Sequence, residues 1–305
     1  SSPLCSSNEV GLWEAFFTST SAITVTGLTI IDIGNDLNIF GQIFLAFMLL
    51  SGGLGLMAIT IFLQGFVVKG TKLRTRLDKG KTLDEFGVGG IGRTFQSILI
   101  TATCIISFGA IILYFFGFLD IQNNWQRLWS SIFHSISAYN NAGFSLFSNS
   151  IEDYRSNLIV NIVFIFLIVM GGLGWRVIDD IWSNKNNLSY RKLSLHSRLV
   201  IRTSLSLILF GSLGFFVTET LLNSQFFNDL NFFEKLLSSI FETVSARTAG
   251  FTNSPISLNS ISDTGLLLLM TLMFIGASTG GTGGGIKTTT FIALMAATRS
   301  TLRGQ

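Results

Sequence analysis

The chain has 305 residues, of which 48% are hydrophobic and only 12% are charged, and its mean hydropathy is +0.56. Soluble globular domains carry about 25% charged residues, so this composition excludes an ordinary soluble domain. The formal net charge of +3 is small and gives no reason to expect nucleic acid as a partner. We therefore expect a chain embedded in a lipid bilayer.

The predicted elements are helices, because 29 phenylalanines and only two prolines accompany long apolar stretches without the ten-residue alternation of membrane strands. Three segments too short to cross a bilayer alternate with uncharged stretches near or above the roughly 20 residues that cross one. In chain order these are Trp13 to Ala22 (short), Ile39 to Val68, Phe95 to Phe118, Trp125 to Ala138 (short), Leu158 to Trp175, a weaker stretch from Thr203 to Thr218, Phe232 to Ala246 (short) and Gly265 to Ile286. This order predicts an all-α polytopic membrane protein.

Basic residues gather in two regions of the chain. Seven of the 20 Lys and Arg lie between Lys69 and Arg93, and six more lie between Arg176 and Arg202. Both regions follow an odd number of crossings, so the positive-inside rule places them in the cytoplasm and the N-terminus outside. Twelve of the 17 acidic residues then lie outside, either raising the local cation concentration or serving simply as solvated loop charges.

A short tract that ends in glycine and a large apolar residue occurs three times, as T-V-T-G-L, N-N-A-G-F and R-T-A-G-F. The glycines Gly27, Gly143 and Gly250 are 116 and 107 residues apart, which predicts one supersecondary unit used repeatedly. A short segment precedes each tract and a long stretch follows it, as expected for a half-crossing helix with an extended return loop. Such backbone is tolerated at membrane depth only where protein shields it or where it lines a watery cavity. Three tracts therefore predict a lined pathway, with all three on its outer side.

Cation binding is the chemistry that these tracts favour. Glycine adopts positive φ at little cost, which lets successive carbonyl oxygens point the same way. A ring of carbonyls can replace the hydration shell of an alkali cation, and the C-terminal end of the preceding helix also favours a cation. The candidate filter residues are Thr24, Val25, Thr26, Gly27, Asn140, Asn141, Ala142, Gly143, Arg247, Thr248, Ala249 and Gly250. The alternative, close helix packing through small residues, explains one tract but not three with matching flanks.

The last uncharged stretch is interrupted by a run rich in glycine. Each glycine destabilises a helix by about 1 kcal/mol relative to alanine, so we expect an unwound loop at membrane depth. The candidate gate residues are Gly276, Ala277, Ser278, Thr279, Gly280, Gly281, Thr282, Gly283, Gly284, Gly285 and Lys287. A nucleotide-binding Walker A loop is the competing interpretation, but Ile286 separates Gly285 from Lys287, and an apolar span precedes the run.

The three tracts, G-G-L-G at Gly52 and at Gly171, and G-A-S-T-G-G-T-G-G-G-I-K-T from Gly276 together resemble the Trk/Ktr/HKT potassium transporters, most closely the membrane subunit of bacterial Ktr systems. The resemblance covers essentially the whole chain. It implies units of span, pore helix, filter loop and span around one pore: residues 1–68 form repeat one, 69–182 repeat two and 183–305 repeat three. It further implies that the glycine-rich run is an intramembrane gate, and that Gly27 marks potassium preference, where serine goes with sodium permeation.

The same resemblance implies potassium as cargo, with sodium stimulation left open, no organic cofactor and no enzyme activity. It also implies a homodimer on a cytoplasmic ring of nucleotide-binding regulatory subunits, in a bacterial cell membrane. The family's opening span and fourth repeat are absent. Either the 305 residues are part of a longer protein, which we favour, or another chain supplies the missing quarter. Thr279, where relatives commonly carry proline, and the charge of Arg176 leave details of gating open. The alternative function is a secondary transporter that binds an organic solute at broken helices.

Polar residues near the expected pathway have two interpretations each. Arg247 either anchors its helix end, as by pairing with Glu242, or tunes ion occupancy. Lys287 either hinders ions at the gate or extends toward the cytoplasm. Asn140 and Asn141 either offer oxygens to the ion or, as we favour, hydrogen-bond behind the filter to hold its carbonyls. His134, on the second short segment, is expected to be a packing residue.

Overall fold

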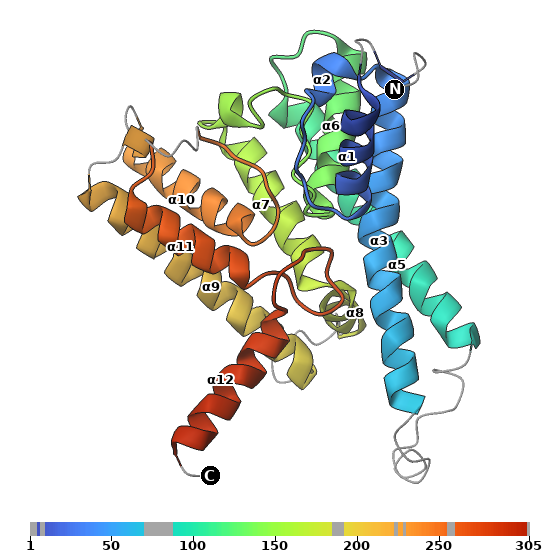
Figure 1. The fold of residues 1–305 in the computed structure, drawn as a ribbon, viewed down its shortest axis with the longest axis vertical. Helices are drawn as coiled ribbons and strands as arrows, with labels where there is room; N and C mark the ends of the chain where they lie inside the picture. The colour runs from blue at the N-terminus through green and yellow to red at the C-terminus, as the bar shows by residue number, and fades with distance from the viewer. Residues whose placement is uncertain are drawn as a thin grey trace.

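The computed structural model describes residues 5–6, 10–69, 88–184, 192–222, 225–227, 230–254 and 260–303, and every regular element within them is a helix (Figure 1). The all-α expectation is therefore confirmed for this part of the chain. In chain order the elements are α1 Leu12–Ile23, α2 Ile33–Asp36, α3 Ile39–Lys69, α5 Val88–Ile112, η2 Leu113–Gly117, α6 Asn124–Tyr139, η3 Glu152–Tyr154, α7 Leu158–Leu173, α8 Trp175–Ser183, α9 Leu195–Leu221, η6 Gln225–Phe227, α10 Phe232–Ala246, α11 Asp263–Phe274 and α12 Thr288–Leu302.

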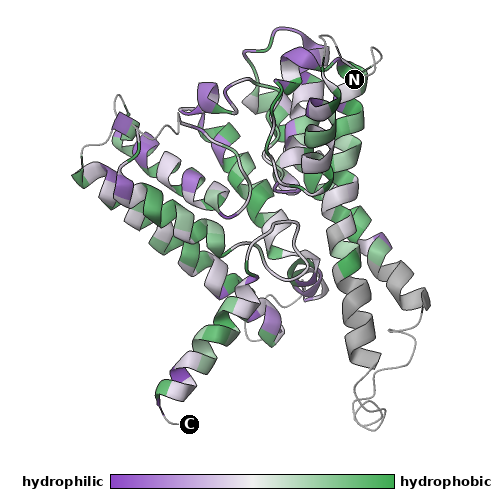
Figure 2. Cartoon of the chain, viewed as in Figure 1, coloured by the Kyte–Doolittle hydropathy of each residue, from purple (hydrophilic) through white to green (hydrophobic). Residues whose placement is uncertain are grey.

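Three helical stretches are long and apolar enough to cross a membrane: Ile39–Ile59, Phe95–Gly117 and Leu195–Leu221. Helices α7 and α8 meet at Gly174 with a bend of 94°, and they provide a fourth membrane-crossing stretch if the two are counted as one span. Figure 2 shows apolar residues along these helices, with hydrophilic residues gathered near their ends and in the connecting loops. Much of the two basic regions that orient the chain, residues 70–87 and 185–191, lies outside the described residues.

Two predicted spans have different bounds in the structure. The weak stretch from Thr203 to Thr218 is part of α9, a continuous helix of 27 residues that begins where Ser194 Oγ accepts the N–H of Ser197. The predicted span from Leu158 to Trp175 instead ends at Leu173, because Gly174 has φ of 84° and turns the chain into α8. A Cβ at Gly174 would lie 2.7 Å from the carbonyl carbon of Gly280, so tertiary contact enforces this turn.

The short helices are held by the longer ones that flank them. Helix α1 packs on α3, α6 lies between α5 and α7, and α10 contacts α7, α9 and α11. Buried aromatic side chains join these pairs: Phe133 of α6 belongs to a core with Leu49 of α3, and Phe241 of α10 belongs to a second core with Phe164 of α7. Helix α7 thus lies between α6 and α10 (Figure 1).

Candidate functional site

The three glycine tracts share an unusual backbone conformation. In each tract the second and fourth residues have positive φ: Val25 55° and Gly27 85°, Asn141 55° and Gly143 72°, Thr248 71° and Gly250 79°. The glycines suit this conformation, but a left-handed β-branched valine is a genuine outlier. Such strain persists only where surrounding structure over-determines it, and it gathers at functional sites. An alternation of handedness along the backbone allows successive carbonyl groups to point toward the same side.

The end of each short helix holds the tract that follows it. The third tract residue donates its N–H to the carbonyl oxygen of a serine in the last turn: Thr26 to Ser21 at 2.9 Å, Ala142 to Ser137 at 2.9 Å and Ala249 to Ser245 at 2.8 Å. In all three helices this serine is followed by alanine. The C-terminal, partially negative ends of α1, α6 and α10 therefore close directly onto the tracts.

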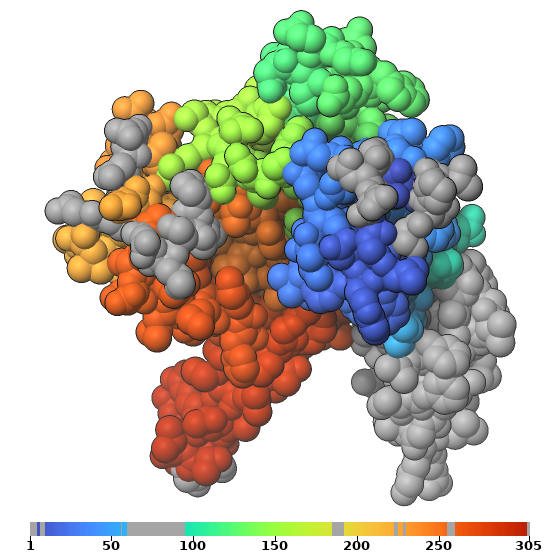
Figure 3. Space-filling view, turned by 45° about the horizontal axis from the view of Figure 1, so that its top comes forward, coloured from blue at the N-terminus to red at the C-terminus, as the bar shows by residue number. Residues whose placement is uncertain are grey.

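The tracts, more than 100 residues apart in sequence, lie against one another. A Cβ at Gly27 would lie 2.3 Å from the carbonyl oxygen of Ala142, and a Cβ at Gly143 would lie 2.7 Å from that of Ala249. Figure 3 shows the first, middle and last parts of the chain, in blue, green and orange, meeting around the centre of one face. Glycine is therefore required at both positions for two reasons. The backbone has positive φ there, and the backbone of the neighbouring tract leaves no room for a Cβ.

A polar cavity of about 300 Å³ adjoins the tracts, and Gly143 and Gly250 form part of its wall. Asp32 also lines it and accepts hydrogen bonds from Ser148 Oγ at 2.5 Å and from the N–H of Gly34 at 3.0 Å. Partial burial by itself would raise the pKa of Asp32, but the hydrogen bonds from Ser148, Asn35 and Gly34 outweigh it and hold that pKa below its usual value. The cavity thus carries a fixed negative charge.

The two asparagines of the second tract point away from each other. Asn140 Nδ2 donates to the carbonyl oxygen of Ile136 at 2.8 Å, within its own helix, and its Oδ1 lies against Gly53 of α3. Asn141 Nδ2 donates to Thr282 Oγ1 at 3.1 Å. Neither amide donates to a carbonyl oxygen of the tracts, and both side-chain oxygens are buried without a hydrogen-bond partner in the described part of the chain. The preference for the second interpretation therefore stays a prediction.

The glycine-rich run is an unwound loop between the end of α11 and the start of α12. Its backbone folds on itself, since Ala277 N–H donates to the carbonyl oxygen of Gly284 at 3.1 Å. It also bonds to α7, where Gly171 O accepts the N–H of Thr282 at 3.1 Å, and to the end of α6, where Tyr139 O accepts from Thr282 Oγ1 at 3.1 Å. The predicted break in the helix is confirmed, and the loop is packed against the end of α6 and the second tract.

Two cationic side chains, those of Arg247 and Lys287, both bind the loop. Arg247 Nη2 donates to the carbonyl oxygen of Gly276 at 3.1 Å, and Lys287 Nζ donates to that of Gly283 at 2.7 Å. The expected pairing of Arg247 with Glu242 is not found among the described residues, because Glu242 Oε1 instead accepts the N–H of Asn253. The Lys287 side chain is thus bound to the backbone of the loop itself.

His134 is a packing residue, as expected. Its side chain is fully buried and stacks on Phe147 with ring centroids 4.6 Å apart. Sequence analysis missed its second property, which is a hydrogen bond from the N–H of Leu146 to Nε2 at 3.3 Å. The available signal was a histidine directly after Phe133 in a short segment that pairs with the second tract.

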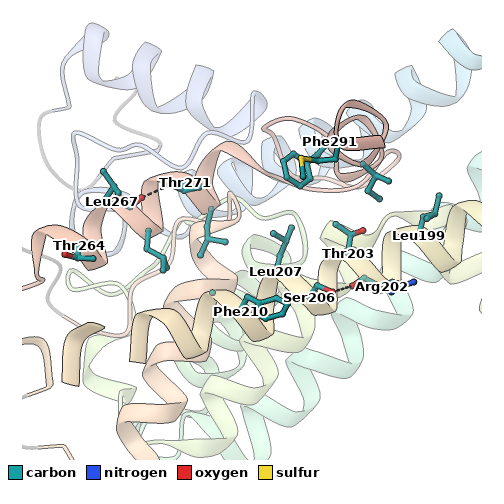
Figure 4. A pocket seen from close by; sticks show the side chains of 15 residues that line it. Leu199, Arg202, Thr203, Ser206, Leu207, Phe210, Thr264, Leu267, Thr271 and Phe291 are labelled. Atoms are coloured by element: carbon teal, nitrogen blue, oxygen red, sulfur yellow. Dashed lines mark hydrogen bonds between the residues drawn. The ribbon is translucent and has the colours of Figure 1, made fainter. Parts of the chain in front are cut away.

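A further cavity of about 740 Å³ opens between α9, α11 and α12, and none of the candidate filter or gate residues lines it (Figure 4). Two of its hydroxyls are bonded to their own helices, Ser206 to Arg202 O at 2.8 Å and Thr271 to Leu267 O at 2.9 Å. The rest of the lining is mostly apolar, and Arg202, Thr203 and Thr264 are its other polar residues. It lacks the convergent polar groups by which sites recognise organic solutes, so it gives that alternative no support.

Apolar helices, a buried unwound loop and convergent glycine tracts define a polytopic helical membrane protein. The chain belongs to the TrkH family of cation transport proteins, whose family model matches residues 1–305. The relatives found are ion transporters, in agreement with the expectation that the chain is not an enzyme.

Curated relatives match nearly the whole chain. It is 33% identical over 304 residues to Ktr system potassium uptake protein B of Bacillus subtilis (strain 168), covering 99% of this chain and 66% of that protein. It is 33% identical over 303 residues to the protein of the same name from Vibrio alginolyticus (99% and 65%), and 33% identical over 296 residues to potassium/sodium uptake protein NtpJ of Enterococcus hirae (96% and 63%). The chain therefore spans slightly less than two thirds of the length of these relatives.

The same fold occurs in a solved structure. The crystal structure of the potassium transporter TrkH from Vibrio parahaemolyticus aligns with a TM-score of 0.73 at 21% identity, covering 97% of this chain and 56% of that one. The helical architecture is therefore that of a known transporter.

Proposed function

We propose that the protein to which this chain belongs takes up potassium ions through a filter built from the backbone carbonyl oxygens of the three tracts. The observation that carries the proposal is the alternating left-handed backbone at equivalent positions, in tracts that touch at Gly27, Ala142 and Gly143. Carbonyl oxygens fixed in this way can replace the hydration shell of a potassium ion. The names of the relatives in Bacillus subtilis, Vibrio alginolyticus and Enterococcus hirae support potassium as the cargo.

The glycine-rich loop is the proposed gate of this pathway. Its contacts with Asn141, Arg247 and Tyr139 O support that role, because they connect the loop to the second and third tracts and to the helix end between them. In the closed state the loop blocks the passage beneath the tracts, and in the open state these hydrogen bonds are released.

The driving force in this proposal is electrical. The membrane potential contributes about 2.3 kcal/mol per charge per 100 mV, which moves potassium inward without ATP hydrolysis when the tracts face outside. A homodimer resting on a cytoplasmic ring of nucleotide-binding regulatory subunits, in a bacterial cell membrane, completes the proposal. Its support is that two of the relatives are named as components of a Ktr system. Sodium stimulation stays an open part of it.

The test is rescue of a potassium-uptake-deficient bacterium by the full-length protein and by Gly27→Ser. A Cβ at Gly27 would lie 2.3 Å from Ala142 O, so serine must displace a carbonyl of the second tract. We expect loss of growth at low potassium and greater sensitivity to sodium. Gly55→Ser on α3, where nothing lies within 4 Å of the added Cβ, is the matched control. Unchanged potassium growth and sodium exclusion in Gly27→Ser would contradict the filter assignment.

A further inference from the structure

The three short helices carry a buried polar residue at one equivalent position. Thr18, His134 and Glu242 each follow a phenylalanine directly and lie three residues before the Ser-Ala pair that closes onto the tract. Their side chains are 3%, 0% and 2% exposed. A buried polar side chain destabilises the fold unless it is hydrogen-bonded. A hydrogen-bond partner is therefore expected for each of the three side chains.

In the second helix this residue accepts a hydrogen bond from the chain that leaves the tract. The N–H of Leu146, the third residue after Gly143, donates to His134 Nε2 at 3.3 Å, and Ser145 Oγ lies 3.0 Å from the same nitrogen. His134 Nδ1 lies 2.7 Å from the carbonyl oxygen of Ser130. A carbonyl can only accept, so the proton is on Nδ1 and the lone pair of Nε2 faces Leu146.

In the third helix a different side chain makes the same contact. The N–H of Asn253, the third residue after Gly250, donates to Glu242 Oε1 at 3.1 Å. The Asn253 side chain continues the network, because its Nδ2 donates to Asn161 Oδ1 of α7 at 2.7 Å. Histidine and glutamate differ in size and shape, but each places a side-chain acceptor against the N–H of the third residue after the glycine, so this contact is what the two positions have in common.

The first helix lacks this contact. Thr18 Oγ1 is buried without a hydrogen-bond partner in the described part of the chain, since threonine is too short to reach across. The residue equivalent to Leu146 and Asn253 is Ile30, which is 61% exposed. The return segments of the second and third tracts are therefore each tied to their own helix, and that of the first is not.

We propose that His134 and Glu242 are positioning residues, which fix the return segments of the second and third tracts and so keep the carbonyl oxygens of those tracts in register. This inference rests on the proposed function, because register affects ion choice only if the tracts bind the ion. A merely structural role would change stability and leave ion choice unaltered. The return segment of the first tract has no such hydrogen bond, so the first tract is the one of the three whose position can shift.

The experiment compares variants of the full-length protein in liposomes by the ratio of potassium to sodium uptake. His134→Phe keeps the aromatic packing on Phe147 and has no acceptor. Glu242→Met keeps the approximate length and replaces the carboxylate oxygen by a thioether sulfur, which is only a weak acceptor. Each should lower the ratio about tenfold, the scale of one lost buried hydrogen bond. Glu242→Gln retains an oxygen acceptor and should stay near the wild-type ratio.

Ser135→Ala and Ser238→Ala are the controls, because both hydroxyls are buried on the same two helices without a partner among the described residues. Neither should change the ratio. Wild-type selectivity in both His134→Phe and Glu242→Met would overturn the inference while leaving the proposed function intact. A wild-type protein that transports no potassium would contradict the proposed function instead.

Hydrogen exchange on the wild-type protein provides a second measurement that does not depend on the folding of any variant. The amides of Leu146 and Asn253, which are bonded to buried acceptors, should exchange at least about tenfold more slowly than that of Ile30. Equal exchange at all three positions would overturn the inference.

Discussion

Asn141, in the second glycine tract, donates a 3.1 Å hydrogen bond to Thr282, in the glycine-rich loop between α11 and α12. The two residues are 141 positions apart, and the same Thr282 hydroxyl donates to the carbonyl oxygen of Tyr139 at 3.1 Å. One side chain therefore connects the proposed gate both to the proposed filter and to the helix that supports it.

Removal of this hydroxyl should favour the open gate. Thr282→Val keeps the shape of the side chain and loses both hydrogen bonds, each with a net value of about 1 kcal/mol, so potassium flux should rise roughly fivefold or more. Thr298→Val is the control, because the Thr298 hydroxyl bonds only to Leu294 O on the exposed face of α12. Initial rates of potassium uptake at equal expression measure the effect. Equal rates in the two variants would show that Thr282 does not hold the gate.

Deletion of the loop should raise potassium flux more than Thr282→Val does. Removing residues 279–284 takes away Thr282 and Gly280, whose carbonyl oxygen accepts the N–H of Trp175 at 3.3 Å. Without these contacts the remaining loop cannot cover the end of α6, and potassium flux should exceed that of Thr282→Val. An unchanged or reduced flux in a correctly folded deletion variant would contradict the gate assignment.

Val25 tests the left-handed backbone directly. Its φ of 55° suits glycine, whereas proline is restricted to φ near −65°. Val25→Gly should therefore retain potassium uptake within about twofold, and Val25→Pro should abolish it. Growth of the uptake-deficient strain at low potassium separates the two variants. Transport by the proline variant would show that the backbone at Val25 does not shape the pathway.

Asp32 should attract cations to the polar cavity beside the tracts. Asp32→Asn keeps hydrogen-bonding capacity but removes the charge, so the potassium concentration for half-maximal uptake should rise about threefold at low ionic strength and less at high salt. Asp263→Asn, on the first turn of α11 and outside the cavity wall, is the control. A salt-independent effect would exclude electrostatic attraction.

The lowered pKa of Asp32 gives this effect a pH dependence. The carboxylate is fully charged above its ordinary pKa, and the attraction is lost only as pH falls through the lowered folded value. The difference between wild type and Asp32→Asn should therefore persist at all pH values above about 4 and shrink below that. A difference that disappears near neutral pH would identify another group as the source.

Local physics sufficed for the short helices and for the break in the last span. The predicted segment from Trp125 to Ala138 differs from α6 by one residue at each end, and the predicted Phe232 to Ala246 coincides with α10. Apolar periodicity and the low helix propensity of glycine act over a few residues, so they can be recognised in the sequence without knowledge of the tertiary structure. The same reasoning failed at Gly174, where the turn depends on contact with Gly280, 106 residues further along the chain.

The sequence by itself determined the class of protein, the repeated glycine tracts and the unwound loop, because composition, period and propensity are local or additive quantities. Only the tertiary structure decided that Val25, Asn141 and Thr248 share the left-handed backbone of the glycines, and that His134 and Glu242 make one equivalent contact. The sequence identified Gly27, Gly143 and Gly250 as repeats, and the fold brought their tracts into contact. Such contacts join residues far apart in the chain, and their geometry is set by the packing of whole helices rather than by neighbours in sequence.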